Sequence, residues 1–86
     1  MYTDGKYTYK YMQEAIITLD GTAWKDIDED GWGVLLIDMQ STEPVIDSPC
    51  SSINNKPIVS MSSTFNTSKS TLIDLSNFDT SNVKNI

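Results

Sequence analysis

No histidine and no arginine occur among the 86 residues, and Cys50 is the only cysteine. Without histidine, the chain cannot form a Ser–His–Asp triad, a Cys–His dyad or a Cys/His zinc site. A single cysteine cannot form an internal disulfide, and we expect Cys50 to be a half-buried, unreactive thiol. These absences predict a protein that is not an enzyme and that needs no cofactor.

Basic residues are scarce, since six lysines stand against twelve acidic residues and give a formal net charge of −6. Residues 1–47 carry ten acids and three lysines, whereas residues 48–86 carry two acids and three lysines. An acidic chain without guanidinium groups repels phosphate backbones, so we expect no direct binding of nucleic acid. The acidic half instead favours a protein partner with a basic surface.

Long apolar runs are also missing. No run approaches the roughly 18 residues that span a bilayer. The first residues, MYTDGKYTYKYMQEA, lack the cationic start and the apolar stretch of a signal peptide. We therefore expect no membrane partner and a single small domain with a thin margin of stability.

Local patterns predict strands at two places. The pair Asp4-Gly5, between short aromatic arms, is typical of a hairpin with a type I′ turn. The apolar run 34–37 has the length of a buried strand, and we place the centre of the N-terminal core there. The following stretch, residues 41–57, is rich in Ser, Pro and Asn and has the composition of a loop or linker.

Between these strands, a short amphipathic helix is predicted over residues 9–19. Its apolar residues recur at spacings of three and four, with Gln13 and Glu14 on the opposite face and Asp20-Gly21 as the stop. These apolar residues are Tyr9, Met12, Ile16 and Leu19. A strand is the alternative, because residues 16–18 are β-branched. The predicted fold class is therefore α+β, with residues 1–56 as an N-terminal α+β cap.

The stretch 25–34, KDIDEDGWGV, places three alternate aspartates before a glycine. Asp26, Asp28, Asp30 and Gly31 match positions 1, 3, 5 and 6 of an EF-hand calcium loop. The glutamate that closes such a loop at position 12 is replaced by Ile37, so calcium binding is a weak interpretation. A solvated acidic turn is the plainest one, because turns gather Asp and Gly for backbone reasons.

A protein-contact surface is the third interpretation of the same stretch. The acidic loop lies between two tryptophans. Aromatic rings supply desolvated anchors in interfaces, while carboxylates attract a basic partner over a longer distance. The predicted partner-binding residues are Trp24, Asp26, Asp28, Glu29, Asp30 and Trp32.

The segment 72–86, LIDLSNFDTSNVKNI, resembles the BspA-like leucine-rich repeats of bacterial surface proteins. The segment 61–65 resembles the Met-x-x-Met-Phe part of the same repeat. The resemblance implies one leucine-rich unit over residues 57–86. It also implies that four apolar residues of this unit are core residues, namely Leu72, Leu75, Phe78 and Val83.

An internal interval agrees with the resemblance. Ile58 and Val83 are 25 residues apart, and so are Met61 and Ile86. Repeat units of this size cannot cover their own apolar edge and therefore stack on neighbours. The resemblance thus implies an open edge near residues 72–75, available to a partner or to a second copy of the chain.

Two functions are considered, both of the binding class, and the sequence favours the first, a small inhibitor. The size, the charge and the missing catalytic groups are typical of a small phage- or bacterium-encoded inhibitor. Such an inhibitor, like anti-CRISPR proteins, occludes the basic, nucleic-acid-binding surface of a defence nuclease in the cytoplasm of the bacterial host cell. The alternative, implied by the resemblance, is a fragment of a bacterial leucine-rich-repeat adhesin at the cell surface. An inhibitor is expected if the chain is complete, and an adhesin if the reading frame continues through further similar units.

Overall fold

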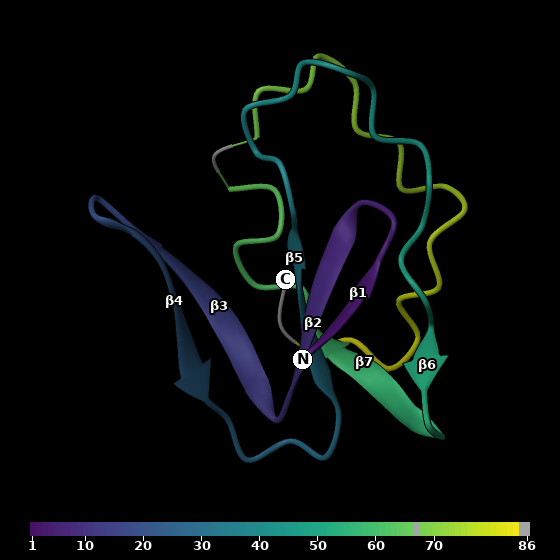
Figure 1. Ribbon diagram of the computed structural model, residues 1–86. Coiled ribbons are helices and arrows are strands. Elements are labelled where there is room, and N and C mark those ends of the chain that lie inside the picture. Colours follow the sequence, from purple (N-terminus) through teal and green to yellow (C-terminus); the bar gives the residue numbers. More distant parts are fainter. Residues whose placement is uncertain (67, 85–86) are drawn as a thin grey trace.

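The computed structural model describes residues 1–66 and 68–84, and all regular structure in these ranges is β-strand (Figure 1). One sheet has the strand order β1-β2-β5-β7-β6, and a second sheet contains β3 and β4. The predicted α+β class is therefore wrong. The strands are β1 (Tyr2–Asp4), β2 (Tyr7–Tyr11), β3 (Gln13–Thr18), β4 (Gly21–Asp26), β5 (Trp32–Leu36), β6 (Ser52–Ile53) and β7 (Lys56–Ser60).

The helix predicted over residues 9–19 is replaced by two strands. β2 ends at Tyr11, Met12 has a φ of 54°, and β3 then leaves in a new direction (Figure 1). The β-branched residues 16–18 lose side-chain freedom in a helix and favour β3. The apolar spacing of three and four runs across two strands that meet at Met12. Reading residues 9–19 as one element therefore mistook it for helical periodicity.

The hairpin predicted at Asp4-Gly5 is confirmed, but its turn type is not. Asp4 pairs with Tyr7, so the two turn residues are Gly5 and Lys6. Of these two, only Gly5 has a positive φ, 55°. That pattern fits a type II′ turn with glycine first, whereas the predicted type I′ turn needs a positive φ at both residues.

The core lies on one face of the five-stranded sheet. β5 confirms the strand predicted at residues 34–37, and it occupies the centre of this sheet, between β2 and β7. Its register with β2 places tyrosines of β2 opposite apolar residues of β5, on one face. The buried core cluster consists of Tyr7, Tyr9, Val34, Leu36, Val45, Ile58 and Met61.

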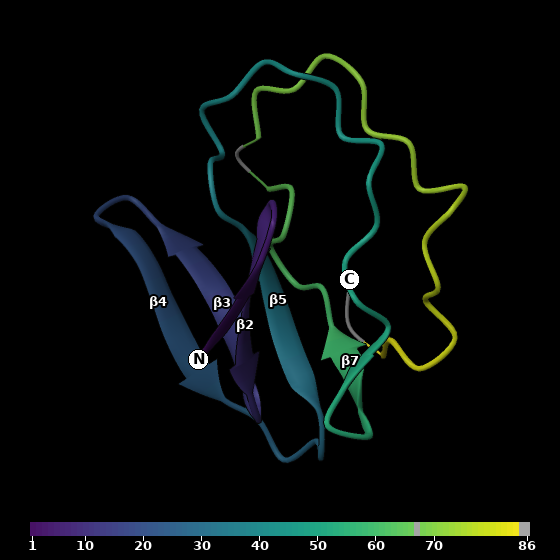
Figure 2. The same ribbon diagram turned by 45° about the vertical axis from the view of Figure 1, so that its right-hand side comes forward.

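The β3–β4 hairpin crosses the opposite face of the sheet at Gly33. A Cβ atom on Gly33 would collide with the Gln13 carbonyl oxygen and would lie 2.9 Å from Glu14 Cα. Because Gly33 has no side chain, the backbones of β3 and β5 can approach this closely. Away from the crossing, the hairpin projects from the rest of the molecule (Figure 2).

From β5 onward, the chain forms two successive segments that lie side by side and run in the same direction. We call residues 32–53 the first arc, and residues 58–66 with 68–84 the second arc. The two arcs pair in parallel through Trp32 and Ile58, and again through a bridge between Val45 and Ile73. Figures 1 and 2 both show the second arc beside the first along the upper part of the molecule.

The four residues that the resemblance placed in a repeat core differ in burial. Leu72 and Leu75 are 53% and 46% exposed, so their predicted burial is wrong. Phe78 and Val83 are half-buried and pack against the core. The first arc covers the second arc on one side only, which leaves the two leucines exposed. Ile86, one member of the 25-residue interval, lies outside the described residues.

Candidate functional site

The acidic loop, residues 26–31, joins β4 to β5 at one end of both sheets. Met12, in the bend between β2 and β3, ties down both ends of this loop. Its amide donates to the Gly31 carbonyl (2.6 Å), and its carbonyl accepts a hydrogen bond from the Ile27 amide (3.1 Å). The loop backbone is therefore fixed to the scaffold, and its carboxylates are presented outward.

Two carboxylates of the loop are paired with lysines from the second half of the chain. Glu29 lies 2.9 Å from Lys84 Nζ, and Asp30 lies 3.0 Å from Lys56 Nζ. Asp30 also accepts a hydrogen bond from the Tyr11 hydroxyl. The bond from Tyr11, followed by the bond from Lys56, lowers the pKa of the Asp30 carboxyl. The two lysines offset part of the negative charge of the loop.

The other two carboxylates, Asp26 and Asp28, are exposed. Asp26 accepts a hydrogen bond from Gln13 Nε2 (2.7 Å), which leaves its charge uncompensated. Within residues 1–66 and 68–84, neither Asp26 nor Asp28 forms an ion pair. These two aspartates therefore carry the exposed negative charge of the loop that no lysine offsets within residues 1–66 and 68–84.

The three aspartates do not converge as a calcium loop would require. In the described part of the chain, no group of three or more acidic or cysteine side chains is placed to hold a metal ion. Asp26 contacts Gln13, whereas Asp30 contacts Tyr11 and Lys56. The missing closing ligand at Ile37 is consistent with this geometry.

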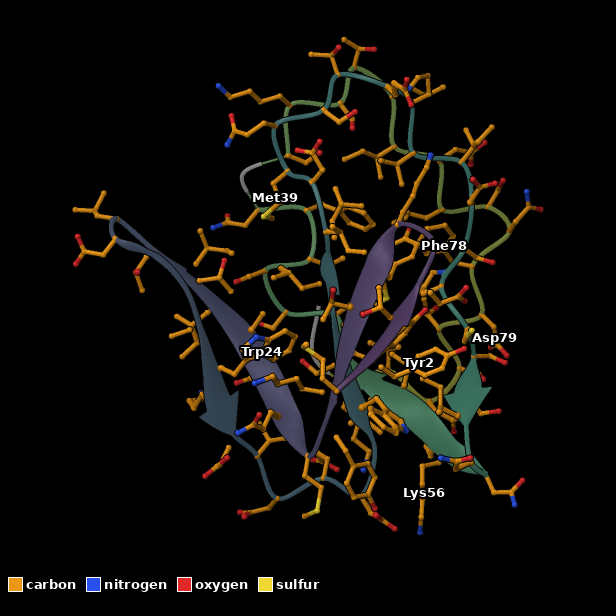
Figure 3. All side chains as sticks on the ribbon, viewed as in Figure 1. Tyr2, Trp24, Met39, Lys56, Phe78 and Asp79 are labelled. Carbon is orange, nitrogen blue, oxygen red and sulfur yellow. The ribbon has the colours of Figure 1, made fainter. Side chains whose placement is uncertain are left out.

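The two tryptophans lie on opposite faces of the five-stranded sheet. The Trp32 ring lies 5.2 Å from the Tyr11 ring, and its Nε1 donates to the Ile53 carbonyl (3.2 Å). Trp24 lies on the hairpin, with Lys10 Nζ 5.6 Å from its ring centre (Figure 3). Because Lys10 and Tyr11 are consecutive in β2, they point to opposite faces. The six predicted partner-binding residues therefore do not form one continuous surface.

A polar hollow of about 430 Å³ lies between the acidic loop and β7. Glu14, which is only 5% exposed, lines it. Its Oε1 lies 2.8 Å from Lys25 Nζ, and its Oε2 accepts a hydrogen bond from Ser60 Oγ (3.2 Å). Sequence reasoning missed this residue because it placed Glu14 on the polar face of a helix. The available signal was the opposite charge of Lys25, which faces Glu14 once the hairpin register is known.

Cys50 is half-buried, as predicted. Its Sγ donates to Asp4 Oδ2 (2.7 Å), and its amide donates to the Tyr9 hydroxyl (2.8 Å). The hydrogen bond to Asp4, together with burial, raises the pKa of the thiol. The thiolate is therefore disfavoured at neutral pH, which makes Cys50 a poor nucleophile.

The outer side of the second arc presents unpaired backbone groups beside an isolated β-bridge between Val45 and Ile73. The Val45 amide donates to the Leu72 carbonyl (2.7 Å), and the Asp74 amide donates to the Val45 carbonyl (2.8 Å). Backbone groups alternate along a strand, so the amide and carbonyl of Ile73 point away from the first arc. No strand of the described residues pairs with that side, and the exposed Leu72 and Leu75 flank it.

In comparisons with known proteins, no family model, no curated protein and no solved structure matches this chain. None of the described residues forms a helix that is long and apolar enough to cross a membrane. The resemblance of residues 57–86 to BspA-like repeats stays a prediction. Function is therefore inferred from the acidic loop and from the edge of the second arc.

Proposed function

We propose that the chain is a non-enzymatic protein-binding module, and that its partner adds an extended segment to the free edge at Ile73. Its main support is the parallel bridge between Val45 and Ile73. Because Val45 and Ile73 already form an isolated parallel β-bridge, a third extended segment can hydrogen-bond to the outward amide and carbonyl of Ile73. Apolar side chains of that segment would cover Leu72 and Leu75, which are about half exposed.

The resemblance to BspA-like repeats supports the same kind of activity. Proteins built from stacked units bind through the surface of the coil and leave an apolar edge at the end of the stack. The two arcs follow one path side by side, as stacked units do. We therefore favour the adhesin-type module over the inhibitor as the function of this chain.

Site-specific photo-crosslinking tests the proposed edge. A photoreactive amino acid replaces Leu75 in one variant and Thr42, an exposed residue of the first arc, in a control variant. Each variant is incubated with bacterial extract and with the surface fraction of bacterial cells. We expect a discrete crosslinked protein from position 75 that is absent from position 42. Equal crosslinking at both positions would show that the edge has no selectivity.

A second variant separates edge pairing from simple apolar adhesion. Ile73→Pro removes an outward amide, while the Leu72 carbonyl and the Asp74 amide keep their bonds to Val45. We expect Ile73→Pro to abolish the crosslink from position 75, with the fold checked by circular dichroism. An undiminished crosslink in the folded variant would contradict strand addition.

A small acidic inhibitor is the second candidate, supported by the exposed charges of Asp26 and Asp28, which form no ion pair within the described part of the chain. In this function the loop replaces phosphates in a basic groove of a nuclease. Reversing Glu29 and Asp30 as well would break their ion pairs with Lys84 and Lys56, so a loss of binding could not be distinguished from a loss of stability. The informative variant therefore changes only the two exposed aspartates.

Charge reversal at these two positions tests the inhibitor. Asp26→Lys/Asp28→Lys should weaken binding to a captured nuclease about tenfold or more and reduce its dependence on salt. The control Asp20→Lys/Glu43→Lys makes the same change in net charge at exposed positions elsewhere. If both double variants weaken binding equally, only the net charge matters and the loop has no specific role.

A further inference from the structure

We propose that two copies of this chain associate through the outer edges of their β4 strands, which together form one four-stranded antiparallel sheet. This inference is independent of the edge at Ile73. It concerns the β3–β4 hairpin, which forms a two-stranded sheet of its own. In the described part of the chain, β4 has no strand on its outer side, and that side faces away from the rest of the molecule in Figures 1 and 2.

The register of the hairpin identifies the backbone groups that face outward. Thr18 and Gly21 flank a two-residue turn and form a hydrogen-bonded pair. Hydrogen-bonded pairs then recur at every second position, down to the bond from the Ile27 amide to the Met12 carbonyl. The amides and carbonyls of the intervening residues of β4 therefore point to the outer edge. These residues are Thr22, Trp24 and Asp26.

β4 has few of the devices that protect most edge strands. It contains no proline, its register with β3 is uninterrupted, and most of its residues are exposed. Lysine on an edge usually blocks pairing, but Lys25 is engaged with Glu14 of its own hairpin at 2.8 Å. The edge is therefore open to a strand of suitable sequence.

A second copy of β4 has a suitable sequence. Because the outward residues are 22, 24 and 26, the full-length antiparallel register places Trp24 opposite Trp24 of the other copy. The same register places Thr22 opposite Asp26 of the other copy, twice, and Lys25 opposite Ala23. Within β4, no like charges face each other, and a hydroxyl can donate to each carboxylate. Cross-strand aromatic and polar pairs of this kind stabilise sheets.

The global charge opposes association, whereas the local register favours it. Each copy carries −6, so the copies repel one another at low ionic strength. We therefore expect a reversible dimer that strengthens as salt screens the repulsion. This is opposite to the salt dependence of an interface held by charge attraction.

Sedimentation equilibrium of single-site variants tests the register. Thr22 is exposed, so Thr22→Lys and Thr22→Glu should leave the fold intact, which circular dichroism checks. Thr22→Lys places a lysine opposite Asp26 of the other copy and should strengthen the dimer about threefold or more, whereas Thr22→Glu should weaken it similarly. The controls Thr42→Lys and Thr42→Glu make the same changes in net charge away from β4.

Two outcomes would overturn the proposal. The wild-type chain could remain monomeric up to about 1 mM in roughly 0.5 M salt, conditions in which even a weak dimer would be detected. Alternatively, the variants at Thr22 could shift the dissociation constant no more than the variants at Thr42. The second result would assign any dimer to another surface.

Discussion

Gly33 is the residue at which the two sheets meet, and it shows how one missing side chain positions a whole element. A methyl group there would occupy the space of the Gln13 carbonyl and approach Glu14 Cα. Nothing in the sequence around Gly33 marks this contact, because the residues that it meets lie about 20 positions earlier. Close approaches of this kind depend on the tertiary fold and not on local pattern.

Substitution of this residue gives a sharp prediction at the residue scale. Gly33→Ala should destabilise the fold by about 3 kcal/mol, because backbone atoms of β3 cannot yield to a new methyl group. Gly5→Ala, where nothing lies within 4 Å but φ is +55°, should cost about 1–2 kcal/mol. Urea unfolding of both variants measures the difference. An equal cost would place β3 away from Gly33.

The exposed repeat leucines give a second prediction at this scale. Leu75→Ala should cost less than about 1 kcal/mol, because nearly half of its surface already faces solvent. Leu36→Ala, at a position 4% exposed, should cost about 3 kcal/mol. Chemical denaturation of the two variants compares them directly. If Leu75→Ala lowers the free energy of unfolding as much as Leu36→Ala, the Leu75 side chain is buried in solution.

At the scale of elements, the predictions that succeeded were local. The hairpin at Asp4-Gly5 and the central strand at 34–37 were confirmed. A turn glycine and a short apolar run specify the backbone conformation of residues adjacent in sequence, so no distant contact is needed to predict them. The helix over 9–19 failed because a bend at Met12 depends on the loop that Met12 holds. The parallel pairing of Val45 with Ile73 joins the predicted loop 41–57 to the segment where the resemblance implied an open edge, and local pattern alone could not show that these two segments meet.

In the candidate site too, local features were predicted from the sequence and contacts between distant residues were not. Composition identified the acidic loop, and the loop is exposed as a turn of this composition should be. The lysines that pair with Glu29 and Asp30 come from distant residues, so the sequence could not show that part of the charge is offset. Separation of the tryptophans likewise follows from the alternation of β2, which the predicted helix concealed.

The ion pair between β3 and β4 gives a prediction at this scale. Lys25→Met should destabilise the fold by about 1–2 kcal/mol, because it removes the Lys25 ammonium from beside the buried carboxylate of Glu14. Lys56→Met breaks an exposed pair with Asp30 and should stay within about 0.5 kcal/mol of the wild type. Thermal and urea unfolding of both variants supply the comparison. Equal effects would indicate that Glu14 is solvated.

At the scale of the whole molecule, the buried tyrosines couple the fold to alkaline pH. Burial, aided by the charge of Asp47, raises the pKa of Tyr7 from 10.0 to about 12. The folded chain therefore keeps a proton that the unfolded chain releases. The resulting stability is fully present below pH 10 and is lost as the pH rises through about 12. Tyr9 contributes in the same direction.

Alkaline unfolding checks this coupling. The free energy of unfolding should fall between pH 10 and pH 12, and Tyr7→Phe should show a smaller fall because one coupled proton is gone. Tyr2→Phe serves as the control, since Tyr2 is exposed. A fall of the same size in Tyr7→Phe as in the wild type would mean that Tyr7 ionises normally in the folded chain.

The central claim is that the chain acts through the outward backbone groups of Ile73. Its most direct test is amide hydrogen exchange at this residue, in the free protein and in the complex with the protein crosslinked from position 75. In the free protein, the Ile73 amide should exchange fast. The Val45 amide, which donates to the Leu72 carbonyl, and the Asp74 amide, which donates to the Val45 carbonyl, should be protected. In the complex, the Ile73 amide should become protected. Unchanged exchange at Ile73, with new protection only in residues 26–31, would contradict the claim and would favour the acidic loop as the binding site.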